Sequence, residues 1–191
     1  MFVGIVAGLF IFLIGCFFLQ GLRKIPAQPP HKGILTIFGK RVLKIKNEGW
    51  RFFPFYPWWY GFIRINVTKV NQDLEPEDVR TPELAELSVP ISLTWTPDKM
   101  DPKNLIEFLN SGGIEGVKEI LDDMVAERVR VWAIAADEGP QTWQDAIKAQ
   151  DLAVKILIEH IAGETFTDDA IRKIRHGNGL QTIPSLGIVL N

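Results

Sequence analysis

The sequence predicts an α+β protein in which an apolar N-terminal helix precedes a β-rich region and then a largely helical region. Residues 1–19 contain no charged side chain. Between residues 33 and 96, several short segments have the strand pattern of apolar residues alternating with polar ones, most clearly residues 63–68 and 87–96. After Pro97, apolar residues recur with the 3.6-residue period of helices. These three observations predict the order of the elements.

The composition excludes several classes of protein. Of the 191 residues, 47% are hydrophobic and 23% are charged, which is unlike a disordered chain. The single Cys16 excludes an internal disulfide framework and a cysteine-type zinc site. The histidines have no metal-binding spacing, and no phosphate-binding loop or nucleophile motif is present. We therefore expect no catalytic centre, no cofactor and no metal.

Residues 1–22 are predicted to form an uncleaved transmembrane anchor. A helix of that length measures about 33 Å, which is enough to cross the hydrocarbon core of a bilayer. A cleaved signal peptide is the rival interpretation, but no charged region precedes the apolar run and no A-x-A-like site follows it. Gly4 and Gly8 form a pair of small residues that would let two such helices associate.

Charge divides the chain into two parts. Residues 1–70 carry ten Lys or Arg and one acid, which is Glu48, whereas residues 71–191 carry eleven bases and twenty-two acids. Cations that follow an apolar helix predict a cytoplasmic location for the bulk of the chain. We expect five of them to face the anionic leaflet: Arg23, Lys24, Lys32, Lys40 and Arg41. Nucleic-acid binding is disfavoured, because these residues do not follow one helix.

Aromatic residues dominate positions 50–62, where they fill nine of thirteen places. Pro54 and Pro57 prevent a regular helix or a central strand there. Because Trp and Tyr favour the headgroup layer of a bilayer, we expect this loop to insert into the near leaflet. The inserting residues are predicted to be Phe53, Phe55, Trp58 and Trp59. A buried plug in a protein core is the alternative.

Strands are expected on both sides of the aromatic loop. Residues 33–38, 42–46 and 63–68 have the pattern of short strands. Residues 87–96 alternate without a break and predict one longer strand, in which Pro90 marks an edge or a bulge. The acidic stretch between them is predicted to be a connecting segment with one short strand at 78–81.

Four helices and a final strand are expected after Pro97. Asp101 caps the first helix, which ends before Gly112. The others are predicted at 114–136, 142–161 and 168–175, and the strand at 186–190. The apolar stripe of helix 142–161 is typical of a domain core, and an intersubunit seam is the alternative. The predicted domains are the anchor 1–22, a basic linker 23–32, a membrane-proximal β-rich subdomain 33–96 and an α/β subdomain 97–191.

The order of these elements resembles the SPFH family, also called Band 7 or prohibitin homology, which includes stomatins, prohibitins and flotillins. The resemblance depends on FGK at residues 38–40, EGWRFFPF at 48–55, the strand before Asp101 and LGIVL at 186–190. It implies an SPFH-type fold, with a β-rich subdomain near the membrane and an α/β subdomain after it.

The resemblance also implies a non-enzymatic function at a membrane. Such proteins oligomerise into rings or cages that organise membrane microdomains, and some restrain membrane-bound AAA-type proteases. The implied partners are membrane lipids, further copies of the chain and such a protease. A non-caging accessory subunit of one membrane enzyme or channel is the alternative function.

Three further expectations come from the comparison with the family pattern. Family members continue into a long helix after the last strand, so we expect the chain to stop before a C-terminal coiled coil. Some relatives lie on the outer face of a bacterial inner membrane, which is the alternative location. Residues 163–185 form a longer insertion than the resemblance implies, and no role is predicted for them.

Overall fold

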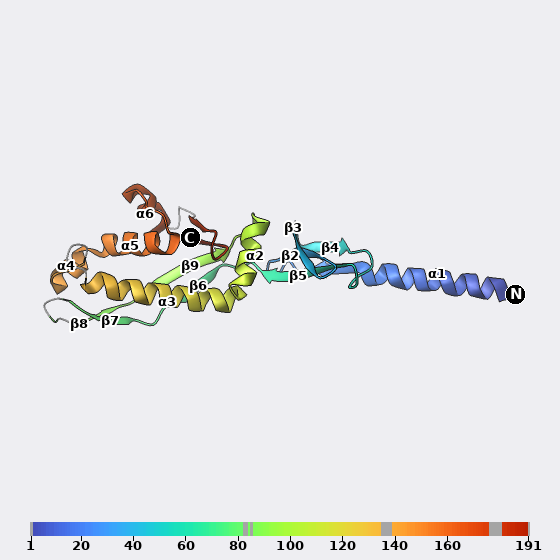
Figure 1. The fold of residues 1–191 in the computed structure, drawn as a ribbon, viewed down its shortest axis with the longest axis horizontal. Coiled ribbons are helices and arrows are strands. Elements are labelled where there is room, and N and C mark those ends of the chain that lie inside the picture. The colour runs from blue at the N-terminus through green and yellow to red at the C-terminus, as the bar shows by residue number, and fades with distance from the viewer. Residues whose placement is uncertain (1, 82–83, 85, 135–138, 176–180, 191) are drawn as a thin grey trace. The chain divides into compact units, whose positions relative to one another are not determined.

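The computed structural model describes residues 2–81, 84, 86–134, 139–175 and 181–190 (Figure 1). The chain forms two compact units. The first unit comprises Met1–Thr68 and Lys99–Lys103, and the second comprises Lys69–Asp98 and Asn104–Asn191. The first unit therefore ends well before residue 96, the predicted end of the β-rich subdomain.

The first unit combines one long helix with two small antiparallel sheets in its described residues. Its elements are α1 (Phe2–Gly21), β1 (Leu22–Ile25), β2 (His31–Ile37), β3 (Lys40–Lys46), β4 (Gly49–Phe52) and β5 (Tyr60–Asn66). Strand β2 is the centre of the three-stranded sheet β3-β2-β5, and β1 pairs with β4 in a separate ribbon. Ile25, Ile34 and Ile65 are buried in the core of this unit.

The predicted hairpin at 33–46 is confirmed as β2 and β3. The predicted basic linker 23–32 differs, because its first residues form β1, whose partner is Gly49–Phe52 of β4. Four residues of sequence LRKI carry no periodic signal of their own. This strand exists because β4, far along the chain, supplies its hydrogen-bond partners.

Helix α1 occupies the segment that was predicted to be a transmembrane anchor. In the part of the chain that the structure describes, no helix is long and apolar enough to cross a membrane, so the predicted span is not supported. The helix ends at Gly21, where the backbone of the aromatic segment approaches closely. A Cβ atom on Gly21 would lie 2.6 Å from the carbonyl oxygen of Phe53, so a larger residue would force the two segments apart.

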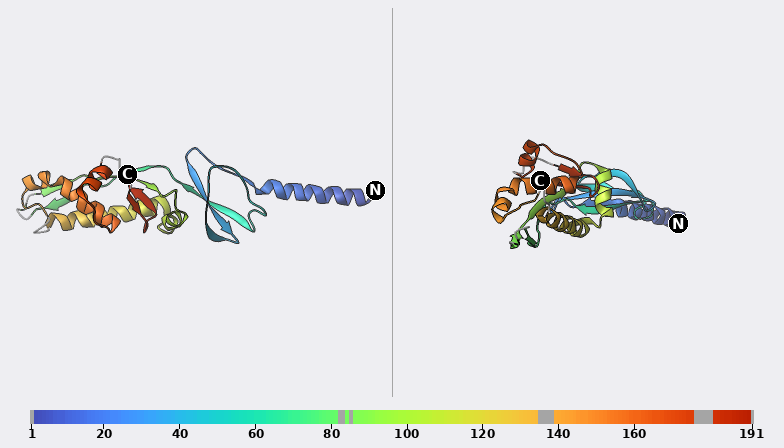
Figure 2. Two further views of the ribbon diagram at one scale, coloured as in Figure 1. Left: turned by 90° about the horizontal axis from the view of Figure 1, so that it is seen from above. Right: turned by 60° about the vertical axis from the view of Figure 1, so that its left-hand side comes forward.

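The second unit contains the remaining helices and two further sheets. Its elements are β6 (Val70–Asp73), β7 (Glu77–Arg80), β8 (Glu86–Val89), β9 (Ser92–Pro97), α2 (Pro102–Asn110, from Asn104 on), α3 (Gly113–Ile134), α4 (Trp143–Lys148), α5 (Gln150–Ala162), α6 (Asp168–Arg175), β10 (Gln181–Ile183) and β11 (Ile188–Leu190). The four-stranded sheet has the order β10-β11-β9-β6, and β7 pairs with β8. Helices α3 and α5 lie side by side (Figures 1 and 2).

The single strand predicted at 87–96 is two strands in the structure. Strand β8 pairs with β7, whereas β9 lies between β11 and β6, so the two belong to different sheets. Pro90, which has no N–H to donate, stands at the break. The predicted connecting segment before it contains β6 as well as β7, because β9 gives the mostly polar segment Val70–Asp73 a pairing partner.

The helices follow the prediction closely, with one exception. The carboxylate of Asp101 accepts a hydrogen bond from the backbone N–H of Lys103 at 2.8 Å, as expected for a helix cap. Helix α6 has the predicted bounds. The predicted helix 142–161 is broken at Ala149 into α4 and α5. The predicted end of α3, beyond Ile134, lies outside the described residues.

Candidate membrane-binding surface

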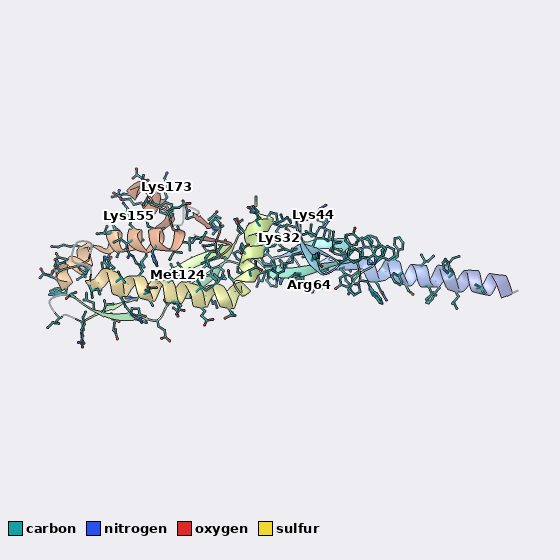
Figure 3. The ribbon with its side chains drawn as sticks, in the orientation of Figure 1. Lys32, Lys44, Arg64, Met124, Lys155 and Lys173 are labelled. Carbon is teal, nitrogen blue, oxygen red and sulfur yellow. The ribbon has the colours of Figure 1, made fainter. Side chains whose placement is uncertain are left out.

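Outside α1, six aromatic side chains in the described residues of the first unit are exposed, and all of them except Trp50 lie in or next to a turn. Phe52 ends β4, Phe55, Trp58 and Trp59 lie in the turn before β5, and Phe38 lies in the turn between β2 and β3. Each side chain is between 45% and 75% exposed. We call Phe38, Phe52, Phe55, Trp58 and Trp59 the aromatic patch. Figure 3 shows the side chains of the first unit gathered around the end of α1.

The rings of the patch contact one another and α1. The ring centroids of Phe55 and Trp59 are 4.5 Å apart, and those of Phe38 and Trp59 are 5.9 Å apart. On the other side, Phe52 stacks on Phe18 of α1 with centroids 5.1 Å apart. The patch is therefore continuous with the apolar side chains of the helix.

Phe53 does not belong to this exposed surface, which corrects the prediction that it inserts into a leaflet. Its side chain is buried, and its ring stacks on Phe62 at 4.7 Å between centroids. The backbone N–H of Phe53 donates to the carbonyl of Gly21 at 2.8 Å, which holds this residue against the end of α1. Phe55, Trp58 and Trp59, the other three predicted residues, are exposed.

Two residues of the patch have an unusual backbone conformation. Phe38 has a φ of 48° and Phe55 a φ of 52°, in the left-handed region that bulky residues rarely adopt. This conformation costs roughly 1–2 kcal/mol for a residue with a Cβ. Phe38 is 68% exposed and Phe55 is 48% exposed, so the first unit buries only part of each ring. Such strained residues are typical of functional sites.

Phe38 was missed in the prediction of this surface. The sequence signal was available, because the dipeptide Phe38-Gly39 lies in a hairpin turn, where a large apolar residue is unusual. Phe38 was not assigned to the surface because it lies more than ten residues before the aromatic segment 50–62. The backbone N–H of Phe38 donates to the carbonyl of Trp59 at 2.8 Å, which brings the two turns together.

An apolar groove separates α1 from the segment that follows β4. One wall is the face of α1 from Phe10 to Phe18, and the other wall consists of Phe52, Pro54 and Phe55. The volume of the groove is about 450 Å³. Its two walls converge at the end of α1, where Phe17 and Phe55 are 6.1 Å apart.

The cations predicted to face a leaflet have different environments. Arg23 and Lys24 lie on β1, and the guanidinium of Arg23 lies 4.5 Å from the centre of the Tyr56 ring. Lys40 and Arg41 begin β3 and are exposed. Lys32 instead pairs with Glu48 at 3.6 Å. A backbone hydrogen bond and then the charge of Lys32 lower the pKa of Glu48.

The comparison with known families identifies the chain. A sequence model of the SPFH domain / Band 7 family matches residues 26–161, which is more than half of the chain. The chain belongs to the SPFH / Band 7 family. The resemblance predicted from the sequence is thus confirmed, and the mixed α and β structure fits an SPFH domain. No curated protein matches the chain. Members of the family are generally membrane-associated scaffolds without enzymatic activity.

The matched SPFH region contains the aromatic patch but not α1. It begins at residue 26, after β1, and it ends in α5. The patch is therefore part of the family domain, whereas the groove is formed by that domain together with a helix outside the match. Of the predicted helix-association pair, Gly8 has no atom within 4 Å of where a Cβ would be, and the surroundings of Gly4 lie outside the described residues.

A second groove lies in the second unit of the SPFH chain. It has a volume of about 430 Å³, and its lining includes Pro90, Trp132, Ile147 and Leu157. Ile147 of α4 is 59% exposed although it lines the groove, and Trp143, about one turn earlier on the same helix, is 50% exposed. The first half of the apolar stripe predicted at 142–161 is therefore not covered within this unit, whereas Ile158 and Ile161 in the second half are buried.

The described residues contain no group of three or more His, Cys, Asp or Glu side chains that could hold a metal ion. The thiol of Cys16 is free and partly buried on α1. The candidate surface of the first unit therefore offers exposed apolar rings and positively charged side chains.

Proposed function

We propose that this SPFH chain is a membrane-bound scaffold whose first unit contacts lipid through the aromatic patch and the apolar side chains of α1. The observation that supports the proposal is the continuous contact between exposed rings and α1, above all the Phe18–Phe52 stack. Exposed apolar surfaces of this kind mark sites of interaction with a protein or a membrane. Nearby Arg23 and Lys24 favour an anionic membrane.

The energies favour membrane contact. A fully buried aromatic side chain removes about 150–250 Å² from water, at about 25 cal/mol per Å², so the exposed half of each ring contributes about 2 kcal/mol on transfer to lipid. A cation near an anionic leaflet adds on the order of 1 kcal/mol. A few rings and cations together suffice for stable binding, and the strained backbone of Phe38 and Phe55 is then offset.

The first experiment measures whether the patch touches the bilayer. The full chain is reconstituted in vesicles that contain lipids brominated near the headgroup, and quenching of tryptophan fluorescence is recorded. We expect the quenched fraction to fall in Trp58→Phe and Trp59→Phe. Trp143→Phe is the matched control, because Trp143 and Trp59 are exposed to similar extents, 50% and 48%. Equal quenching in all variants would contradict the proposed contact.

A fractionation experiment tests membrane association itself. Cells that express the full chain are lysed and centrifuged at high speed, and the protein is expected in the membrane pellet. Recovery in the supernatant would overturn the proposal. We further propose that the bulk of the chain lies in the cytoplasm, where anionic lipids attract its cations. Digestion of sealed spheroplasts by an added protease would instead indicate the outer face of the inner membrane.

Self-assembly is the second part of the proposal. Exposed Trp143 and Ile147 beside the second groove support contact between copies of the chain, as in the ring or cage that the family resemblance implies. Such an assembly would organise a membrane microdomain or restrain a membrane-bound AAA-type protease. Gentle detergent extraction is expected to yield a particle of high mass. A monomer that copurifies with one membrane enzyme at fixed stoichiometry would support the accessory-subunit function instead.

A further inference from the structure

The groove between α1 and the segment after β4 has the size of a ligand site. Its volume of about 450 Å³ lies within the roughly 300–1,000 Å³ of small-molecule sites. Five side chains of α1 line it at steps of one, three or four residues, beginning with Phe10 and ending with Phe18. They share one face of the helix. Every lining side chain is apolar, so the groove suits a hydrocarbon chain.

Positive charge lies directly beyond one end of this groove. In the ribbon formed by β1 and β4, Leu22 is opposite Phe52, and Lys24 is opposite Trp50. Because side chains two residues apart on a strand share a face, Lys24 and Trp50 lie on the same face of the ribbon as Phe52, which lines the groove. They are about 7 Å farther along the strands. Lys24 and Trp50 are both exposed.

The pair of residues between these two pairs adds further positive charge to the ribbon. Arg23 is directly opposite Arg51, and like charges in such a pair repel each other. The sequence from residue 1 to residue 72 contains one acid, Glu48, and its carboxylate pairs with Lys32. The cations of the ribbon therefore exceed the negative charge that this stretch of chain supplies. The side chains of Arg23 and Arg51 point to the opposite face of the ribbon from Lys24 and Trp50, so they add to its positive charge without contacting an anion bound beside Lys24.

We propose that the groove binds one anionic phospholipid, with an acyl chain between α1 and Pro54 and the phosphate beside Lys24 and Trp50. This site deepens the proposed function and depends on it, because it assigns a lipid class to the membrane surface. The apolar groove suits the acyl chain of such a lipid, and the positive charge at one end of the groove suits its phosphate. A zwitterionic lipid would place its own cation beside Lys24, which repels it.

The site is tested on the full chain in nanodiscs of phosphatidylcholine. They contain a small fraction of phosphatidylglycerol that carries a photoreactive diazirine in one acyl chain. After illumination, labelled peptides are mapped by mass spectrometry. The label is expected on the lining residues of α1 and on Phe52 to Phe55. The same diazirine on phosphatidylcholine is expected to label these residues about five-fold less, the factor that one cation near an anionic lipid contributes.

Two pairs of variants separate the parts of the site. Leu13→Trp fills the groove and is expected to lower the labelling at least five-fold, whereas Leu19→Trp makes the same change outside the groove lining and leaves it unchanged. Lys24→Gln is expected to remove most of the preference for phosphatidylglycerol. Lys44→Gln removes an equal charge from β3, which belongs to a different sheet from the ribbon, and is expected to keep the preference.

The outcomes distinguish this site from membrane binding in general. Labelling spread evenly around α1, equal labelling by both lipids, or equal effects of Leu13→Trp and Leu19→Trp would overturn the site while the protein remains in the membrane fraction. The site would likewise be overturned if the groove carried no lipid label and a separately added chemical cross-linker joined two copies through α1. A second copy would then be the occupant of the groove. Loss of the wild-type protein from the membrane fraction would overturn the proposed function as well.

Discussion

Phe53 and Phe55 are separated by one residue, and their side chains have opposite environments. Phe53 is 1% exposed and Phe55 is 48% exposed. The hydrogen bond from the Phe53 N–H to Gly21 fixes the first residue against the core of the unit. The left-handed backbone of Phe55 then reverses the chain direction, so that its ring lies against Trp59 in the patch.

The two residues should therefore respond differently to truncation. Phe53→Ala is expected to lower the free energy of unfolding of the first unit by about 3–5 kcal/mol, because it leaves a cavity beside Phe62. Phe55→Ala should change stability much less and reduce contact with lipid. Denaturant unfolding in detergent and quenching by brominated lipids measure the two effects. Similar losses of stability in both variants would contradict this assignment.

At the scale of elements, α6 is held on α5 by apolar contacts and one ion pair. Ile171 and Ile174 of α6 pack with Ile158 of α5 in a buried cluster. Lys155, which is labelled in Figure 3, donates from Nζ to Oδ1 of Asp168, and the two atoms are 2.8 Å apart according to the structure. This hydrogen bond is the main cause that lowers the pKa of Asp168 and raises the pKa of Lys155. Residues 163–185, whose role was not predicted, thus contain a docked helix.

The ion pair predicts a pH dependence for the docking of α6. The contribution of Asp168 is complete above the ordinary aspartate pKa of 3.8 and is lost as the pH falls through the lower value of the folded state. The contribution of Lys155 is complete below 10.5 and is lost as the pH rises through its higher folded value. Docking is therefore expected to be strongest between about pH 4 and pH 10.

Amide hydrogen exchange of α6 measures this dependence. Asp168→Asn is expected to speed exchange modestly at pH 7, because the Asp168 side chain is largely exposed to solvent. Asp169→Asn is the matched control, since it removes the same charge from the same helix end. If both variants exchanged alike, the effect would belong to charge at the helix N-terminus and not to the pair with Lys155.

At the scale of the whole molecule, the exposed part of α4 predicts how copies of the chain meet. Ile147 lines the second groove and is 59% exposed. Ile147→Glu places a charge on this apolar surface and is expected to shift the detergent-extracted particle towards lower mass in analytical ultracentrifugation. Gln144→Glu adds the same charge to α4 at a residue outside the groove and should leave the mass unchanged. A mass that stays high in both variants would place the contact elsewhere.

Much of the fold was predictable because its signals are local. The cap at Asp101 and the bounds of α6 depend on side chains within one or two turns, and the sequence contains them directly. Strands β1 and β6 were not predictable in the same way, since each depends on partner residues at least 19 positions away in the chain. For the same reason, Pro90 was interpreted as an edge or a bulge of one strand, and the change of sheet at this residue was not predicted.

The sequence alone determined the family, the order of helices and strands and the concentration of aromatic and basic residues before residue 70, because composition and periodicity are properties of short segments. Only the tertiary structure decided which of those residues act together. It buried Phe53, added Phe38 to the patch, paired Lys32 with Glu48 and formed the groove against α1. Whether these side chains are buried, and which residues they contact, depends on segments that are distant in the chain. A local sequence pattern does not predict which distant segments pack together.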